Sequence, residues 1–475
     1  MDPTRREFVA GAAAAGLLSS ACQASTGDEL TPEMFGAKGD GRTNDTAALQ
    51  ALADQVNARG GGTVVLRGVT YIVGSHDQSA RSKGGRGSDF AFPPGRILQF
   101  ADCRSPVIVR GNGAKLRAAA GLRFGYFDPA TGRPFEGGTG AAERGYRASP
   151  YFGMIEALNC TALVEITDVE LDGNLDALEI GGRWGKGRQI SGSGILLAGN
   201  SGPERLSRIY SHHHPLDGMK ITGPNERATS STISDVSCEY NARQGCSLTG
   251  GRNYHFLRCR FRHTGKGRIK SQPKAGFDIE PGRERIARNL SFRDCEFANN
   301  DGFGMAAGGG DSLGSTFDAC TFIGTTNWSA WPNKPGIRFN KCNFVGAITR
   351  GFGDPDPARA AQFHDCSFRD DPALSPTRQV YGDPDWNQSI AVLRRSANVL
   401  FNRCDFALTH QGTLPWSKAD VIFADCRMSQ RSSAQSRPLG TYRGTTIITG
   451  SADLAGSRIL GDVILNGAKL PRTTA

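Results

Sequence analysis

One six-residue pattern recurs through the second half of this chain: an apolar residue, two variable residues, a cysteine, one variable residue and a second apolar residue. "FLRCRF" begins at Phe256 and "FADCRM" begins at Phe423. The copies between them are "FRDCEF" from Phe292, "FDACTF" from Phe317, "FNKCNF" from Phe339, "FHDCSF" from Phe363 and "FNRCDF" from Phe401. Because the intervals are too regular for chance and too long for one helix, the chain must consist of repeating structural units.

Related segments extend the repeat toward the N-terminus. "ITDVEL" from Ile166, "LSRIYS" from Leu206 and "ISDVSC" from Ile233 align with the cysteine copies and give a base unit of about 22 to 25 residues with insertions. This period is typical of solenoids. Leucine-rich repeats share the length, but the sequence has no matching ladder of leucine and asparagine.

Each unit also contains a glycine followed by an alternating apolar triplet. Examples are "GMKI" at Gly218, "GCSL" at Gly245, "GFDI" at Gly276 and "GFGM" at Gly302. Together with the alternation in Cys-x-Phe and the polar turns, a unit reads as three short strands. We therefore predict an all-β chain folded as a parallel β-helix, with three strands per coil and about ten or more coils. The length of 475 residues agrees with a fold that grows along one axis.

The N-terminal segment predicts export. "TRREFVAGAAAAGLLSSAC" contains Arg5 and Arg6 before a short apolar stretch, and it resembles a twin-arginine signal, which carries folded proteins across a bacterial inner membrane. We assign residues 1–26 to this signal and 27–475 to a single catalytic domain, periplasmic or secreted. Cys22 is a candidate for lipid attachment, although the motif around it is incomplete.

The 12 cysteines would normally indicate disulfides in an exported protein. In this chain the repeat gives most of them the same structural position, so neighbours would stack in a column with a spacing of about 4.8 Å. Free cysteine is a small apolar residue that suits such a column. We expect most of the cysteines to be reduced and inert.

A family resemblance is carried by "FGAKGDGRTNDTAALQALADQVNARGGGTVVLRGVTYIV", from Phe35 to Val73. This segment resembles the opening of the pectate-lyase-like superfamily of right-handed parallel β-helices, where it forms a capping helix and the first strands. The apolar spacing agrees: Asp45 is placed to cap a helix through "TAALQALADQV", which "GGG" would end. The resemblance implies a right-handed helix and a carbohydrate-active protein, but the fold alone does not select an activity.

The resemblance also implies where a substrate would lie, namely along one column of strands and its flanking loops. In this chain that column begins with the glycine triplets. Alternation points Met219 inward and Lys220 outward, and by the same rule Ser247, Asp278 and Glu280 face outward in later coils. Lys220 and Asp278 would be two rungs, about 10 Å, apart. We predict Lys220, Asp278 and Glu280 as catalytic residues.

The turns before this column are rich in charged residues and histidine. "SHHHPLD" alone contains three of the eight histidines of the chain. The further candidates are His214 and Arg243 for catalysis, and His213, His263, Lys270, Asp217 and Asp301 for substrate binding. No metal site is assigned, because consecutive histidines rarely converge on one ion.

The first functional hypothesis is β-elimination on a uronate-containing polysaccharide. The formal net charge of +10 fits an acidic polymer. The reaction needs a cation to stabilise the developing enolate and a base of suitable pKa. Lys220, Arg243 or Lys270 would supply the cation. A histidine from 212 to 214, or a lysine with its pKa depressed by cationic neighbours, would be the base.

Two other hypotheses remain open. Asp278 and Glu280 lie two residues apart on one strand face, which is compatible with glycoside hydrolysis by paired carboxylates. A non-catalytic carbohydrate-binding solenoid is the third hypothesis, since the tryptophans fall in predicted loops. Calcium, held by Asp278, Glu280 and Asp217, is the one cofactor considered, as an alternative neutralising charge.

The remaining expectations concern partners. We expect an acidic polysaccharide as the substrate and a monomeric protein. No groove-reading helix is apparent in the sequence, so we expect no nucleic-acid partner despite the basic charge. No segment of the mature chain has the length and hydropathy of a transmembrane helix.

Overall fold

The structure is a computed structural model that describes residues 29–76, 94–128, 131–134, 147–182 and 190–473. The predicted signal at 1–26 and the candidate lipid site Cys22 lie outside these residues. In the described part of the chain, no helix is both long enough and apolar enough to cross a membrane.

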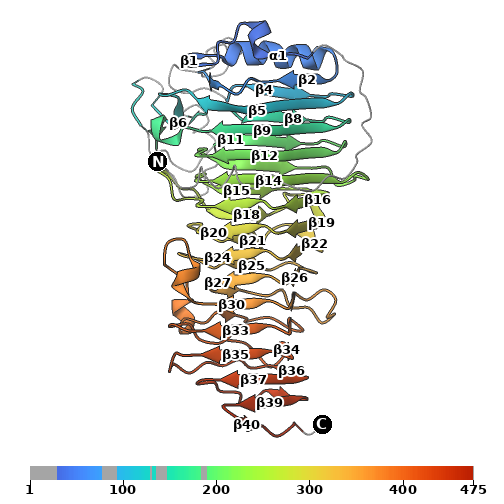
Figure 1. The fold of residues 1–475 in the computed structure, drawn as a ribbon, viewed down its shortest axis with the longest axis vertical. Coiled ribbons are helices and arrows are strands. Elements are labelled where there is room, and N and C mark those ends of the chain that lie inside the picture. The colour runs from blue at the N-terminus through green and yellow to red at the C-terminus, as the bar shows by residue number, and fades with distance from the viewer. Residues whose placement is uncertain (1–28, 77–93, 129–130, 135–146, 183–189, 474–475) are drawn as a thin grey trace.

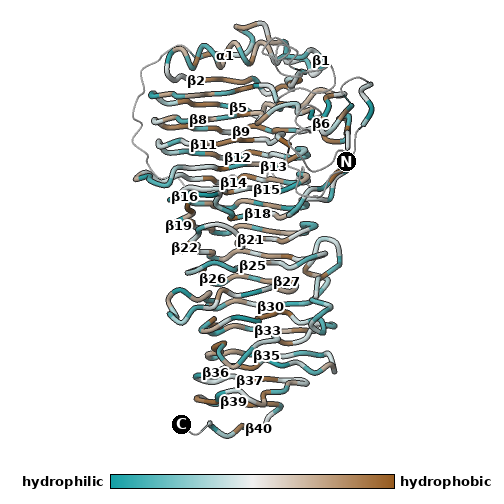
Figure 2. The backbone as a smooth tube through the Cα atoms, turned by 180° about the vertical axis from the view of Figure 1, so that it is seen from behind, coloured by the Kyte–Doolittle hydropathy of each residue, from teal (hydrophilic) through white to brown (hydrophobic). Residues whose placement is uncertain are grey.

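The chain forms an elongated right-handed parallel β-helix, as the sequence predicts (Figure 1). Each coil contributes strands to three columns. Successive members are β18, β21 and β25 in the first column, β19, β23 and β26 in the second, and β20, β24 and β27 in the third, and Figure 1 labels strands of all three. Successive coils pair in parallel and in register. Hydrophobic and hydrophilic stretches alternate along the stacked coils, as Figure 2 shows, because every second side chain of a strand points into the core.

The first column is a ten-stranded sheet. Its strands are β4 (Leu98–Ala101), β8 (Gly153–Leu158), β11 (Ser193–Ala198), β13 (Asp217–Thr222), β15 (Gln244–Leu248), β18 (Ala275–Ile279), β21 (Met305–Ala307), β25 (Ala330–Pro332), β28 (Ile348–Thr349) and β31 (Ala391–Val392).

The second and third columns are joined by long strands that bend at a corner and belong to both. These are β5 (Val107–Ala118), β9 (Val164–Asp172), β12 (Glu204–His212) and β14 (Ser231–Glu239). The second column adds β2 (Gly62–Val65), β16 (Gly251–Leu257), β19 (Ile286–Arg293), β22 (Asp311–Leu313), β23 (Thr316–Asp318), β26 (Arg338–Asn340), β29 (Gln362–His364), β32 (Leu400–Asn402), β34 (Ile422–Ala424), β36 (Thr441–Arg443) and β38 (Arg458–Ile459).

The third column completes each coil before the chain turns back to the first. It adds β3 (Thr70–Val73), paired with β1 (Asp40–Asn44), and β17 (Arg260–Arg262), β20 (Glu296–Ala298), β24 (Thr321–Ile323), β27 (Asn343–Val345), β30 (Ser367–Arg369), β33 (Asp405–Leu408), β35 (Arg427–Gln430), β37 (Thr445–Thr449), β39 (Asp462–Leu465) and β40 (Ala468–Lys469).

Other elements lie outside the columns. A three-stranded sheet beside the upper coils contains β6 (Arg123–Tyr126), β7 (Arg147–Ala148) and β10 (Glu179–Gly181). The short 3-10 helices are η2 (Pro32–Phe35), η5 (Leu175–Ala177), η6 (Pro372–Leu374) and η7 (Pro384–Trp386).

The predicted capping helix is present as α1 (Thr46–Ala58), which lies across the N-terminal end of the solenoid (Figure 1). It buries Leu49, Leu52 and Val56 against the first coils, so it shields the otherwise open end of the core. One detail differs from the prediction. The Asp45 carboxylate accepts hydrogen bonds from the backbone N–H groups of residues 38 and 39 rather than from the helix N-terminus.

The cysteine hexapeptide is a corner. Its third residue has φ between 51° and 55° in all seven copies, as in Arg258 and Asp425, so the chain turns there within one residue. The two flanking apolar residues then point into the core on either side. Their rings form two ladders, in which neighbouring centroids are 4.5–5.4 Å apart in the ladder from Phe256 and 4.4–5.5 Å apart in the ladder from Phe261.

The cysteine of each hexapeptide lies between these ladders. All eleven cysteines that the structure describes are free and buried, which agrees with the predicted packing role. At the corner itself, several of the left-handed positions carry opposite charges on successive coils. Arg208 with Asp168, Arg258 with Asp235, and Arg403 with Asp365 form paired hydrogen bonds of 2.5–2.8 Å.

We predict that the ring ladders, rather than the cysteines, carry the stability of the coils. Phe339→Ala should lower the free energy of unfolding by about 3–5 kcal/mol, because it removes a buried ring between two stacked neighbours. Cys342→Ala, the matched change on the same coil, should cost only about 1 kcal/mol. Denaturant unfolding of both variants measures this. Equal losses would mean that the cysteine column contributes more than packing.

Candidate functional site

The outward face of the first column carries the predicted row of polar residues. Lys220 on β13 is in register with Ser247 on β15, and Ser247 is in register with Asp278 on β18. Met219 and its counterparts in the neighbouring strands point into the core. The alternation predicted from sequence is therefore confirmed, and Lys220 and Asp278 lie two rungs, about 10 Å, apart.

A buried ion pair lies at the start of this column. The Arg243 guanidinium donates to Asp217 from Nε at 2.7 Å and through a second, shorter contact from Nη2, and both side chains are buried. The sequence predicted Arg243 as a catalytic residue and Asp217 as a substrate-binding residue. The structure corrects both assignments, because each group is enclosed and bound to the other. Their effect on the row is electrostatic.

Asp278 is a buried carboxyl group with an altered proton affinity. Burial, reinforced by the neighbouring Glu280 carboxylate, raises its pKa to about 7, although Arg243 acts in the opposite direction. Gln244 donates a hydrogen bond from Nε2 to the Asp278 carboxylate at 2.5 Å. Glu280 follows directly after β18 and is exposed. Near neutral pH a substantial fraction of Asp278 therefore carries a proton that it can donate.

Lys220 is the cation on the same row. Burial lowers the pKa of its ammonium group, and the charges of Arg243 and Arg285 lower it further, while Asp217 partly opposes them. No residue that the structure describes forms an ion pair with Lys220. The sequence hypothesis named Lys220 among the candidate cations and offered a lysine with a depressed pKa as one of two alternatives for the base.

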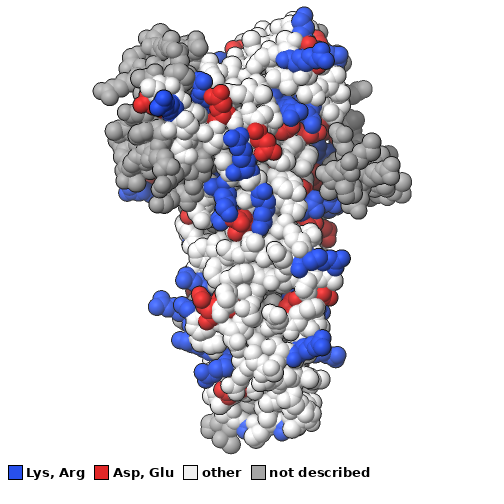
Figure 3. All heavy atoms as spheres, turned by 90° about the vertical axis from the view of Figure 1, so that its left-hand side faces the viewer, with Lys and Arg blue, Asp and Glu red and all other residues white. Residues whose placement is uncertain are grey.

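A cluster of lysines flanks the row at the loops that lead from the third column to the first. Lys274, Lys270 and Lys266 surround the Asp301 carboxylate at 2.5, 3.2 and 3.7 Å. Lys270 keeps 59% of its side chain exposed. Because three ammonium groups face one carboxylate, the cluster retains positive charge. Figure 3 shows charged side chains gathered over the upper half of the side of the solenoid that carries these loops.

The histidines that the sequence placed near the cleft have different environments. His214 is buried, with Nδ1 3.1 Å from the Tyr151 hydroxyl and Nε2 3.1 Å from the carbonyl oxygen of Leu171. Since both ring nitrogens are occupied inside the protein, the structure corrects the assignment of His214 as a catalytic base. His213 and His263 are half-buried and stack on opposite sides of Tyr240, with centroids 5.1 and 4.6 Å away.

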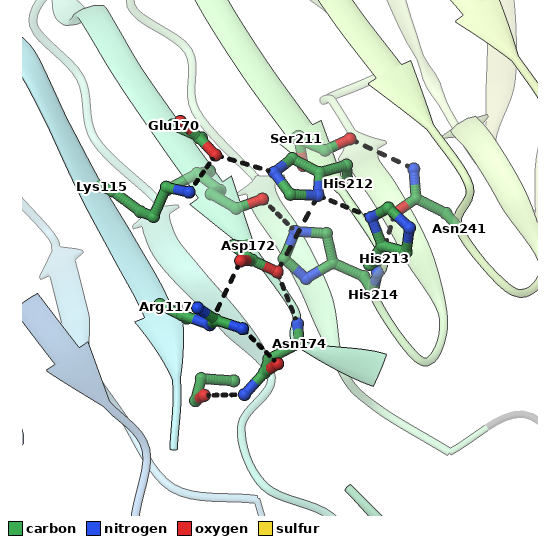
Figure 4. A network of polar contacts seen from close by, with 12 residues as sticks. Lys115, Arg117, Glu170, Asp172, Asn174, Ser211, His212, His213, His214 and Asn241 are labelled. Carbon is green, nitrogen blue, oxygen red and sulfur yellow. Dashed lines mark hydrogen bonds and ion pairs between the residues drawn. The ribbon is translucent and has the colours of Figure 1, made fainter. Parts of the chain in front are cut away.

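Sequence reasoning missed a polar network on the outward face of the third column, drawn in Figure 4. Glu170 accepts from Lys115 at 2.6 Å and lies 3.1 Å from His212. Asp172 lies 3.4 Å from Arg117 and 3.8 Å from His212. Burial acts to raise the pKa of Glu170, but hydrogen bonds with His212 and Lys115 outweigh it and lower the pKa to about 2.

The charges of this network balance internally, since two cations face two carboxylates around His212. Period-two alternation in "KLR" and "VELD" is the sequence signal that would have found these positions.

The calcium hypothesis also loses its third ligand, because Asp217 is bound to Arg243. Among the residues that the structure describes, no group of three or more His, Cys, Asp or Glu side chains could hold a metal ion.

Comparison with known proteins supports the architecture. Residues 155–344 match the family model described as the right handed beta helix region. The chain is a right-handed β-helix. Among solved structures, the N-terminal fragment of gene product 12 of bacteriophage Phi29 is similar with a TM-score of 0.50 and 12% identity, over 93% of this chain and 73% of that chain.

Two curated proteins match a short segment. Capsule KN3-specific depolymerase 1 of Klebsiella phage KN3-1 is 56% identical over 54 residues, which are 11% of this chain and 7% of the phage protein. Alginate lyase 7 of Azotobacter vinelandii is 50% identical over 52 residues, which are 11% of this chain and 6% of that protein. The chain thus spans only a small part of the length of either relative.

We predict that acid destabilises the fold through the buried histidine. Burial, helped by the charge of His212, holds the pKa of His214 well below its usual value. The unfolded chain therefore binds this proton at a higher pH than the folded protein, and stability falls as the pH drops below about 6.5.

The measurement is the free energy of unfolding from denaturant titrations at pH 7.5 and pH 5. The free energy of unfolding should be lower at pH 5 than at pH 7.5, and this difference should shrink in His214→Gln. The difference should persist in His410→Gln, a matched change at an exposed histidine. An unchanged decrease in His214→Gln would contradict this explanation.

Proposed function

We propose that this protein is an exported enzyme that cleaves an acidic, uronate-containing polysaccharide by β-elimination. The observation that carries the proposal is the pair Lys220 and Asp278. Both lie on one outward row, two rungs apart, and burial shifts both pKa values toward neutrality. A base that can lose its proton and an acid that can keep its proton are the two groups that elimination requires.

The reaction follows from these positions. Lys220, in its unprotonated form, accepts the proton from the carbon next to the uronate carboxylate. As that C–H bond breaks, a carbon–carbon double bond forms and the bond to the glycosidic oxygen breaks. Protonated Asp278 gives its proton to this leaving oxygen. Both groups return to their starting states by proton exchange with water.

The developing negative charge on the uronate also needs stabilisation. Lys270 is the most exposed member of the cluster around Asp301 and comes from the loop that leads into β18, the strand of Asp278. Its ammonium group is therefore available to pair with the carboxylate of the sugar.

Independent support comes from the relatives. One is a capsule depolymerase and the other an alginate lyase by name, so both act on polysaccharides. The twin-arginine segment supports action outside the cytoplasm, where such polymers are found. Hydrolysis is the second candidate, because Glu280 raises the pKa of Asp278 and the two carboxyl groups share one strand face.

The proposal predicts the effect of removing either group. Lys220→Met and Asp278→Asn should each lower kcat on a uronate polysaccharide by about 10²- to 10⁴-fold, the usual contribution of an acid or base. Lys341→Met should keep full activity, because Lys341 is an exposed lysine between β26 and β27, at the corner between the second and third columns. A panel of uronate polymers is followed by absorbance of the unsaturated product and by reducing ends. Reducing ends without new absorbance would instead establish hydrolysis.

The proposal also predicts a pH dependence. Burial and Glu280 raise the pKa of Asp278 to about 7. Because the proposed acid must be protonated, kcat/KM should fall as the pH rises past about 7, which gives the profile a limb near that pH. That limb should be absent from the residual activity of Asp278→Asn and retained in Glu239→Gln, a change at a carboxylate of the third column. A limb near pH 7 that survives in Asp278→Asn would assign it to another group.

A further inference from the structure

The outward row that contains Lys220 and Asp278 continues toward the C-terminus. After Asp278 the register gives Ala306, Trp331, Thr349, Val392 and Trp416. Trp331 is thus two rungs, about 10 Å, beyond Asp278. The buried residues Thr349 and Val392 separate the two tryptophans, which are themselves only half-buried.

Other aromatic side chains gather around these two. Phe303 stacks on Trp331 at 5.1 Å and on Trp328 at 5.6 Å, and Trp386 packs against Trp416 at 4.3 Å. The four tryptophans and Phe303 are half-buried rather than enclosed. We call this set, together with Tyr381, the aromatic strip.

The strip is held in place by the protein. The Trp328 indole donates a hydrogen bond from Nε1 to Asp383 at 3.1 Å. Trp331 packs so closely against Gly308 that a Cβ at that position would come within 2.6 Å of the ring. The rings therefore have fixed orientations, which lowers the entropic cost of binding a ligand against them.

Two exposed arginines lie over the strip. The Arg350 guanidinium is 5.8 Å from the ring centroid of Trp331, and that of Arg394 is 4.3 Å from the ring centroid of Trp386. Neither forms an ion pair with any residue in the described part of the chain. Cation–π contact positions each guanidinium on the surface, and Asp383 is the carboxylate that interacts electrostatically with Arg394.

We infer that the aromatic strip binds the part of an acidic polysaccharide that extends beyond the cleavage site. Sugar rings would pack against the exposed parts of the half-buried rings of the strip, and sugar carboxylates would pair with Arg350 and Arg394. The inference rests on the proposed function for the identity of the polymer. Its own support is the continuity of the row with Asp278 and the two exposed arginines that lie over the rings without an ion-pair partner in the described part of the chain.

Binding without cleavage tests this inference. The full mature chain carrying Lys220→Met is run in affinity gels that contain alginate, polygalacturonate or neutral dextran. When Trp386→Ala or Arg394→Ala is introduced into the Lys220→Met chain, its affinity for the acidic polymer in the gel should fall about 5- to 10-fold. Arg395→Ala, at the exposed arginine next in the chain, should change it less than twofold. Trp386→Tyr should restore most of the binding, and thermal melting identifies any variant that fails to fold.

The outcomes separate this inference from the proposed function. If wild type cleaves no polymer but the strip variants still lose binding to the acidic one, the strip is a binding site and only the chemistry is wrong. If the folded strip variants bind like their parent, or if dextran binds as well as the acidic polymers, the inference is overturned whatever the enzyme cleaves.

Discussion

In-register stacking of one coil on the next is the constraint on which this structure depends. Each corner hexapeptide turns the chain at a single left-handed residue, so that its two apolar residues always project into the core at the same place. The phenylalanines then stack ring on ring, as Phe256 does on Phe292 at 4.7 Å. A ladder of this kind tolerates no slip, because a shift of one residue would exchange the inward and outward faces.

The same register builds the candidate site. Residues that are 58 positions apart in the chain, Lys220 and Asp278, are separated by only one strand because every coil returns to the same column. Insertions between columns do not disturb this placement; they only lengthen the loops at the edge. The lysines around Asp301 belong to such an insertion, and they bring positive charge to the row from outside the coil.

Burial determines which polar groups are available for chemistry. Asp217 and Arg243 satisfy each other, and the acidic pair Glu170 and Asp172 is matched by Lys115 and Arg117. Lys220 and Asp278 remain less fully compensated, so desolvation moves their pKa values. An enzyme needs this situation at its reacting groups, since a fully paired charge neither gives nor takes a proton near neutral pH.

The sequence by itself determined the fold, the packing role of the cysteines, the capping helix and the outward positions of Lys220, Ser247 and Asp278. These follow from short-range periodicity, which a repeat displays many times over. Only the tertiary structure decided that His214 is enclosed, that Arg243 is bound to Asp217 and that Glu170 and Asp172 form a network with His212. Burial and pairing between coils depend on which turns close over which side chains, and no local pattern encodes that.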